Sequence, residues 1–305
     1  MRADYIITHE IFIFFIRINI NRLSNTLASG HMKKRLIPSN VKRIIHRSLA
    51  VPIRIKNTEL AQRFWMSDNQ KRILALKNIH FGRRAFIIGN GPSLNRMDLS
   101  LLKNEITFGS NAFFLAKSRI GFLPTYYNIE DPLPAEDNAD TLNELNDTTK
   151  IYAHDLKYCL LPSNNTIYVY FDRYYSKDSS PNFPRFSNNA LKVVYWGGTV
   201  VYMSLQIAFY LGIREAYIIG VDLKYDVPQS AGSDSIITSE SPDKNHFHPD
   251  YFGPGKRWHH PQVERMQRSI ERAAEFFKQN GGGLYNATVG GNLNVLKRVN
   301  YDNLF

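Results

Sequence analysis

Two groups of residues have the types and spacing that chemistry requires, and the first is a glycine turn. Gly89-Asn90-Gly91-Pro92-Ser93-Leu94 directly follows the apolar run Ala85–Ile88. Glycines let a ligand approach the backbone, and the helix start that Pro92 and Ser93 predict would offer free N–H groups to a phosphate. Leu94 stands where the dinucleotide fingerprint Gly-x-Gly-x-x-Gly has its third glycine, so the turn does not match that motif. A purely structural turn is the alternative.

The second group is a cluster of histidines. Four of the nine histidines lie within fifteen residues, at His246, His248, His259 and His260, among aromatic side chains. The ordinary pKa of histidine suits a general base that deprotonates a sugar hydroxyl. Metal binding through His246 and His248 is the alternative, but no pattern of Glu or Asp completes a zinc site, and we expect no metal.

Further polar residues follow predicted strands. Asn90, Asn111 and Asn128 fall at or near the ends of three successive strands, Gly220 follows a later strand, and Thr199 is a natural helix N-cap. Ligands of open α/β sheets bind outside the carboxyl ends of the strands. We therefore expect these residues to share one polar ligand.

The elements that position these residues alternate between short apolar runs and helical patterns. This alternation predicts an α/β fold with a mostly parallel, Rossmann-like sheet, helices on both faces and an irregular lid at about residues 223–260. The predicted strands are Ala85–Ile88, Ile106–Phe108, Thr125–Ile129, Lys150–Tyr152, Thr166–Phe171, Glu215–Ile219 and Gly283–Asn286. The predicted helices are Asp98–Lys103, Phe113–Ala116, Ala139–Leu145, Thr199–Tyr210 and Pro261–Gln279.

The charge of the chain is unevenly distributed. The formal net charge is +11, and ten basic residues with no acidic residue lie between Ile11 and Thr58. The remainder is close to neutral, which argues against a nucleic-acid partner. The basic residues of segment 33–56 instead indicate contact with an anionic membrane surface. A solvated basic tail is the alternative. The single cysteine, Cys159, fits a reducing cytoplasm, and we expect a cytoplasmic protein that lies peripherally on the inner face of the membrane.

Three regions are therefore expected. Residues 1–31 form an extension whose apolar run Ile11–Ile16 is too short to span a bilayer, and they are not used for function. Residues 32–82 form a basic N-terminal arm. Residues 83–305 form the nucleotide-binding domain with its lid.

The order of the motifs resembles a known group of enzymes. Phe86–Leu94, Ser110-Asn111, Tyr127-Asn128, Thr199–Met203 and Gly220-Val221-Asp222 follow one another as in bacterial sialyltransferases that use CMP-sialic acid. The same order occurs in a related family of motility accessory factors and hydroxymethylpterin diphosphokinase-like proteins. The segments His246–Phe252, Trp258-His259 and Tyr285–Thr288 are more similar to this second family, and the resemblance covers residues 83–305.

The resemblance implies a single Rossmann-like domain that binds a cytidine nucleotide without a metal or other cofactor. By this resemblance the phosphate and ribose contact Gly89, Asn90, Gly91 and Ser93, the nucleotide sugar contacts Asn111 and Asn128, and Thr199 and Gly220 line the cytidine pocket.

The catalytic residues are matched less completely. The sialyltransferases stabilise the leaving phosphate with two lid tyrosines. Here Tyr225 lies near the first position, which Lys224 strictly occupies, and no second tyrosine precedes Tyr251. The arginine that binds the donor carboxylate is replaced by Lys192 and Trp196. The family's histidine base matches His259 or His260 by position, with His246 as a further candidate.

We expect an inverting glycosyltransferase that moves a sialic acid-like or Kdo-like ulosonic sugar from a CMP donor to a cell-surface or lipid-linked glycan. A magnesium-dependent diphosphokinase and a nucleotide-binding protein without catalysis are the alternatives. The sequence leaves the oligomeric state open, and a homo-oligomer is compatible with it.

Overall fold

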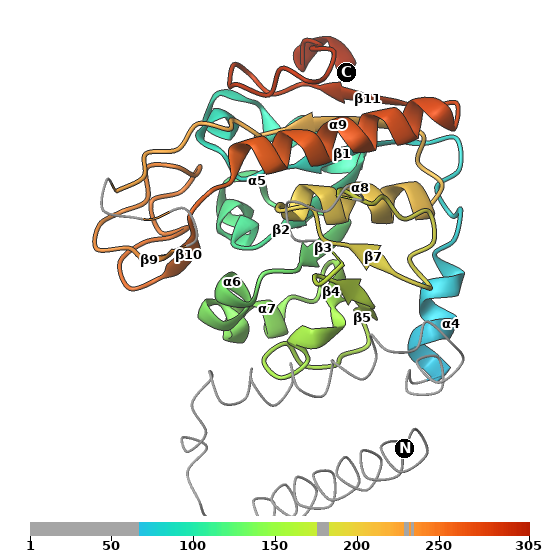
Figure 1. Ribbon diagram of the computed structural model, residues 1–305, viewed down its shortest axis with the longest axis horizontal. Coiled ribbons are helices and arrows are strands. Elements are labelled where there is room, and N and C mark those ends of the chain that lie inside the picture. Colours follow the sequence, from blue (N-terminus) through green and yellow to red (C-terminus); the bar gives the residue numbers. More distant parts are fainter. Residues whose placement is uncertain (1–66, 176–182, 229–231, 233–234) are drawn as a thin grey trace, which may run out of the picture. The chain divides into compact units, whose positions relative to one another are not determined.

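A seven-stranded sheet forms the centre of the computed structural model, with the strand order β11-β8-β1-β2-β3-β4-β5 (Figure 1). Every neighbouring pair of strands in this sheet is parallel. The strands are β1 (Arg84–Ile88), β2 (Ile106–Ser110), β3 (Tyr126–Ile129), β4 (Thr149–Ala153), β5 (Thr166–Val169), β8 (Glu215–Ile219) and β11 (Gly283–Asn286). The predicted α/β class and its parallel sheet are confirmed.

The structure describes residues 67–175, 183–228, 232 and 235–305, all of which belong to one unit spanning residues 46–305. The predicted extension 1–31 and the basic segment 33–56 lie outside the described residues.

The strands are apolar because helices or loops cover both faces of the sheet. In β1, for example, Ala85, Phe86, Ile87 and Ile88 are all almost completely buried. A run without polar alternation is typical of a parallel strand that is buried on both sides. This is why short apolar runs in the sequence located all seven strands.

Two helices cover the same face of the sheet and pack against each other (Figure 1). Helix α8 (Val200–Tyr210) is buried along its whole length and contacts β1 and β3. Its N-cap is Thr199, whose hydroxyl accepts a hydrogen bond from the backbone N–H of Val201. Helix α9 (Val263–Gln279) buries only one stripe, which includes Ile270, Ala273 and Phe277, and its other side is exposed. The apolar helix α8 is therefore the inner helix on this face of the sheet, and the amphipathic helix α9 separates it from solvent.

Shorter helices connect the remaining strands. They are α4 (Ser67–Ala75), α5 (Lys117–Ile120), α6 (Pro132–Asp137), α7 (Ala139–Glu144) and the 3-10 helices η1 (Pro92–Arg96), η2 (Leu99–Asn104), η3 (Phe113–Ala116), η4 (His154–Leu156) and η5 (Asp302–Leu304). Two segments predicted as helices, 98–103 and 113–116, are thus 3-10 helices. Helix α4, within the arm expected at residues 32–82, packs against β5.

Two smaller sheets complete the described fold. Strands β6 (Phe171–Asp172) and β7 (Val194–Tyr195) pair in parallel. Strands β9 (Ile236–Thr238) and β10 (Arg257–His259) form an antiparallel pair inside the predicted lid, and β10 contacts α6. Among the described helices, none combines the length and apolar character needed to cross a bilayer.

Candidate active site

A cavity of about 530 Å³ opens at the carboxyl ends of the central strands. It lies at the ends of the neighbouring strands β1 and β8. From β1 the sheet continues to β2 on one side, and from β8 it continues to β11 on the other side. Such a switch point leaves a crevice between the two connections, and this is where open α/β sheets bind ligands. The cavity at the end of the sheet where the glycine turn lies is therefore a candidate binding site.

Most of the predicted site residues line this one cavity. They are Gly89, Asn90, Gly91, Asn111, Thr199, Gly220, Tyr225, His246, His259 and His260. Ser93 and Asn128 do not line it, although both are buried nearby.

The glycine turn packs tightly against the turn that follows β8. The N–H groups of Gly89 and Gly91 donate to the carbonyls of Ile219 and Gly220, at 2.7 and 2.8 Å. A Cβ atom on Gly89 would lie 2.3 Å from the Gly220 carbonyl oxygen, and one on Gly91 would lie 1.9 Å from Oδ2 of Asp222. The glycines are thus needed for the contact between two turns, a reason that differs from the predicted approach of a ligand.

Asp222 also occupies the predicted anion position beside Ser93. Its Oδ2 accepts hydrogen bonds from the hydroxyl of Ser93 at 2.7 Å and from the N–H of Ser93 at 3.4 Å. The helix after the turn is a 3-10 helix of five residues, with Gly91 as its N-cap. The carboxylate therefore satisfies the donors of Ser93 within the protein.

A row of polar side chains crosses the carboxyl ends of three neighbouring strands. Nδ2 of Asn90 donates to the hydroxyl of Ser110 at 3.1 Å, and Ser110 is the β-sheet neighbour of Asn128. Nδ2 of Asn128 donates to the hydroxyl of Ser204 on α8 at 2.8 Å. The buried Oδ1 atoms of Asn90 and Asn128 have no hydrogen-bond partner among the described residues. A buried acceptor without a partner is costly, and a ligand hydroxyl or amino group can satisfy Asn90 from the cavity.

A second row of contacts fixes the segment that carries His246. The N–H of Phe247 donates to the carbonyl of Asn90 at 2.9 Å, and Nδ2 of Asn95 donates to the carbonyl of Phe247 at 2.8 Å. The ring of Phe247 packs beside that of Phe113, with 5.7 Å between the ring centroids. This part of the predicted lid is therefore attached to the glycine turn itself.

His246 forms a hydrogen-bonded pair with a buried aspartate. Its Nδ1 lies 2.7 Å from Oδ2 of Asp243, and the Asp243 side chain is 3% exposed. Asp243 also accepts from the N–H groups of Asn245 and Phe252. Burial raises the pKa of Asp243, but its hydrogen bonds and the charge of His246 outweigh burial and lower that pKa overall. The imidazole stacks on Tyr251 with 4.0 Å between centroids, so its orientation is fixed.

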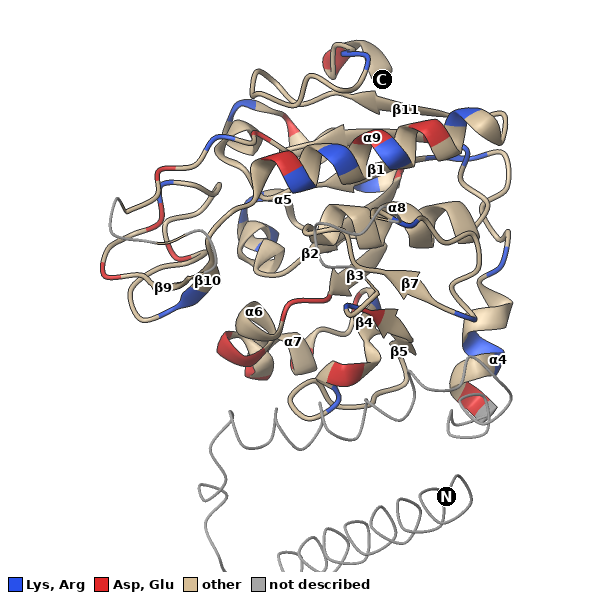
Figure 2. Cartoon of the chain, viewed as in Figure 1, with Lys and Arg blue, Asp and Glu red and all other residues tan. Residues whose placement is uncertain are grey.

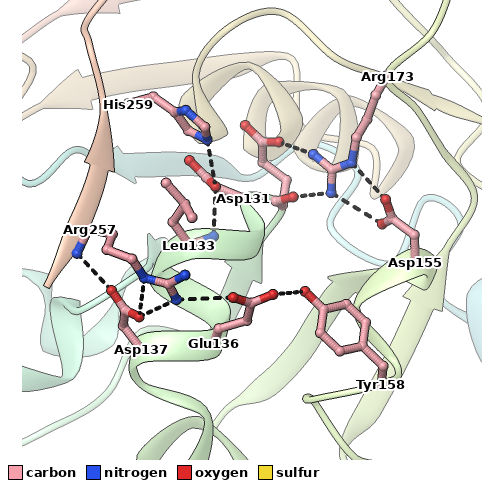
Figure 3. Close-up of polar contacts among 10 residues, drawn as sticks. Asp131, Leu133, Glu136, Asp137, Asp155, Tyr158, Arg173, Arg257 and His259 are labelled. Carbon is pink, nitrogen blue, oxygen red and sulfur yellow. Dashed lines mark hydrogen bonds and ion pairs between the residues drawn. The ribbon is translucent and has the colours of Figure 1, made fainter. Parts of the chain in front are cut away.

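The other two candidate histidines have different surroundings. His259 is on β10, its side chain is 51% exposed, and its Nε2 lies 3.5 Å from Oδ1 of Asp131 (Figure 3). Asp131 also caps α6 by accepting from the N–H of Leu133. The backbone N–H of His260 donates to the carbonyl of Ser235, and its Nδ1 is buried without a partner in the part of the chain that the structure describes.

Tyr225 lies between the turn after β8 and α9. Its hydroxyl is 3.8 Å from the sulfur of Met266, and its ring is 6.5 Å from that of His246. Burial, with a smaller contribution from Asp222, raises the pKa of Tyr225 to about 12. The phenol therefore stays protonated at neutral pH and can donate a hydrogen bond.

Sequence reasoning missed a buried ion triad on the cavity wall. Arg173 follows β6, and its guanidinium bonds Glu130 at 2.7 Å and Asp155 at 2.7 Å (Figure 3). It also donates to the carbonyl of Glu130. Burial raises the pKa of Glu130 to about 7, although the charge of Arg173 acts in the opposite direction. Glu130 follows Asn128 by two residues, and its position past a strand end is the signal that would have indicated it.

One more arginine holds an element of the cavity wall in place, and another lines the cavity itself. Arg257 on β10 bonds Asp137 and Glu136, and thereby joins the β9–β10 hairpin to α6 (Figure 3). Arg265 on α9 lies over the ring of Trp196, 5.1 Å from its centroid. A Cβ atom on Gly198 would lie 2.7 Å from Cδ of Arg265, so glycine leaves room for this side chain. Arg257 and Arg265 lie on elements that are far from the glycine turn in the sequence, and no local pattern indicates them.

Within the described ranges, no group of three or more His, Cys, Asp or Glu side chains is arranged to hold a metal ion.

The solved structures that are similar to this chain include the following two. A glycosyltransferase, MAf from Magnetospirillum magneticum AMB-1, superposes with a TM-score of 0.47 at 17% identity, over 78% of this chain and 39% of that protein. The sialyltransferase CstII from Campylobacter jejuni, in a complex with cytidine-5'-monophosphate, superposes with a TM-score of 0.42 at 16% identity, over 72% of this chain and 86% of that one. This chain therefore spans well under half of the first protein. No curated protein matches the sequence.

A family model, described as "6-hydroxymethylpterin diphosphokinase MptE-like", matches residues 64–227. The match includes β1 to β8, the glycine turn, and the Asn90, Asn128 and Thr199 positions. It covers more than half of the 305 residues and confirms the relationship predicted from the order of the motifs. The chain belongs to the 6-hydroxymethylpterin diphosphokinase MptE-like family.

Proposed function

We propose that this protein is an inverting glycosyltransferase that transfers an acidic ulosonic sugar from a CMP donor to a glycan hydroxyl. The observation that carries the proposal is the Asp243–His246 pair, whose histidine lines the same cavity as the glycine turn. A binding protein needs no oriented base beside its ligand. An enzyme that must remove a proton from an incoming hydroxyl does.

The pair assigns each nitrogen of His246 a role. Nδ1 is held by the carboxylate of Asp243, which favours a proton on that nitrogen and leaves Nε2 as the basic one. Nε2 accepts the proton of the acceptor hydroxyl while the hydroxyl oxygen attacks the anomeric carbon and the bond from that carbon to the CMP phosphate breaks. The carboxylate then stabilises the imidazolium that forms. On these grounds we favour His246 over His259 and His260.

The donor side of the cavity would bind CMP and its sugar. Asn90, Asn111, Thr199 and Gly220 supply polar groups at the strand ends and at the start of α8. The protonated phenol of Tyr225 is a donor for the departing phosphate. Arg265, stacked on Trp196, is our candidate for the sugar carboxylate, because planar guanidinium groups bind carboxylates with two hydrogen bonds.

Thermal unfolding with a panel of nucleotides tests the donor. We expect CMP to raise the melting temperature more than CDP, UDP, GDP or ATP, and to do so in EDTA, because we propose no metal in the site. Stabilisation by ATP that requires magnesium would contradict the CMP proposal.

Release of CMP from CMP-sialic acid, with water or a glycan as acceptor, tests the base. His246→Ala should lower turnover by roughly 10²–10⁴-fold while CMP affinity changes little. Asp243→Asn should also lower turnover strongly, but less than His246→Ala does, because the histidine remains. His248→Ala is the matched control, since His248 is two residues away and does not line the cavity. If His246→Ala keeps full turnover, the proposed base is wrong, and His259→Ala and His260→Ala then identify the alternative.

The family description favours a second candidate, a diphosphokinase acting on a hydroxymethylpterin. That reaction also starts with deprotonation of a hydroxyl, so variants of His246 do not separate the two functions. The nucleotide does, because a diphosphokinase would require ATP as the donor.

A further inference from the structure

Exposed apolar side chains gather in one short segment that the proposed reaction does not use. Leu74, Ile79 and Phe81 are 55%, 49% and 75% exposed, and they lie within eight consecutive residues. In the described part of the chain, nine large apolar side chains are at least 36% exposed, and these are three of them. Exposed apolar groups that lie together, and not singly, mark a contact surface. We call residues 74–83 the amino-end surface.

Hydrogen bonds attach this surface to the central fold. The N–H groups of Asn78 and His80 donate to the carbonyls of Tyr210 and Leu211 at the end of α8, at 3.1 and 2.8 Å. Nε2 of His80 is 2.7 Å from the hydroxyl of Tyr126, the first residue of β3. The segment therefore crosses the amino ends of the strands, and its apolar side chains are held outward by backbone contacts.

The charged side chains of this stretch of sequence are all basic. Residues 69–97 contain no Asp or Glu, and the chain between α4 and β1 accordingly shows blue and tan but no red (Figure 2). Lys77 and Arg83 are exposed and, among the described residues, have no carboxylate partner. Lys71 and Arg84 lie on either side of these two residues in the sequence and do have carboxylate neighbours, Asp68 at 3.8 Å from Lys71 and Glu105 at 2.6 Å from Arg84.

We propose that the amino-end surface binds an anionic lipid bilayer. Phe81, Ile79 and Leu74 would enter the boundary between headgroups and acyl chains, and Lys77 and Arg83 would contact the negatively charged headgroups. A second copy of the chain fits this surface poorly, because a two-fold contact would bring the unpaired cations of both copies together. The proposal does not depend on the reaction that the cavity performs.

The proposal has a consequence for orientation. The amino-end surface and the cavity lie at opposite ends of the parallel strands, because the cavity is built on the carboxyl ends. A protein bound in this way would open its cavity towards the aqueous phase. It would then act on acceptors that extend from the membrane or are dissolved, in preference to headgroups directly below it.

Sedimentation of the full chain with vesicles of phosphatidylglycerol and phosphatidylcholine tests the proposal. We expect Phe81→Ser with Ile79→Ser to weaken binding at least fivefold, and Lys77→Glu to weaken it at low salt only, because exposed charges are screened. Ile236→Ser is the matched control for Ile79. Ile236 is also an isoleucine and is 50% exposed, nearly as Ile79 is, but it lies on the β9–β10 hairpin. Lys244→Glu controls for the added negative charge, and both controls should bind as the unchanged protein does.

Three results would overturn the proposal. The first is that the unchanged protein does not bind anionic vesicles more than neutral ones. The second is that the Ile79 and Phe81 variants bind as well as the Ile236 control. The third is a dimer, detected by analytical ultracentrifugation, that Phe81→Ser dissociates, because the surface would then join two copies of this chain.

Discussion

Glu130→Gln should change how the stability of the protein depends on pH. Burial raises the pKa of Glu130 from its ordinary 4.5 to about 7 in the folded protein. The unfolded chain therefore loses this proton at lower pH than the folded protein does. As pH rises from about 4.5 to 7, the folded state loses stability relative to the unfolded state, and above 7 the loss is constant. The pKa difference corresponds to about 3 kcal/mol.

Glutamine has nearly the same shape, so it still accepts from Arg173, but it does not titrate. Urea unfolding at pH values between 4.5 and 8 measures the free energy of unfolding of both proteins. The difference between them should change by about 3 kcal/mol over this range, in favour of the variant at high pH. Glu144→Gln, an exposed glutamate on α7, should leave the slope unchanged. Parallel curves for the unchanged protein and Glu130→Gln would refute the raised pKa and the burial argument behind it.

Three further predictions concern binding. Asn90→Ala should raise the Kd for CMP by up to about tenfold in calorimetry, because a lost hydrogen bond between neutral groups costs about 0.5–1.5 kcal/mol, and unchanged affinity in a folded variant would make the turn purely structural. Arg265→Met should weaken binding of CMP-sialic acid but not of CMP; equal effects on both ligands would remove its proposed contact with the carboxylate. Deleting residues through Lys56 should weaken sedimentation with anionic vesicles at low salt, and equal binding by the truncated protein would exclude a role for this basic segment.

The sheet could be predicted from sequence because its strands are short and buried on both faces. All seven predicted ranges coincide with the strands of the central sheet, to within one or two residues at most ends. Periodicity was less informative for the connections. The segments 99–104 and 113–116 have room for one turn or two and form 3-10 helices, and neither α4 nor the β9–β10 hairpin was predicted from the sequence. These elements depend on tertiary contacts, such as the pairing of Asn69 with the backbone of Tyr168.

The candidate site was predictable where it depends on strand ends and not where it depends on long-range pairing. The positions of Asn90 and Asn128 followed from the parallel sheet alone. The contact between Ser93 and Asp222 joins residues 129 positions apart, and it exists because β1 and β8 are neighbours. The triad of Glu130, Asp155 and Arg173 likewise joins the ends of three different strands, so the sequence could indicate Glu130 by its place after a strand but not its pairing with the other two residues.

The choice among the histidines shows what the fold adds to the sequence. Position relative to the last long helix favoured His259 or His260. The structure instead attaches the His246 segment to the glycine turn through the hydrogen bond between Phe247 and the carbonyl of Asn90. Asn90 thus faces the cavity with its side chain and positions the neighbour of His246 with its backbone. Under the proposed function, a ligand that shifts this turn would also shift the proposed base, so Asn90 would link nucleotide binding to proton transfer.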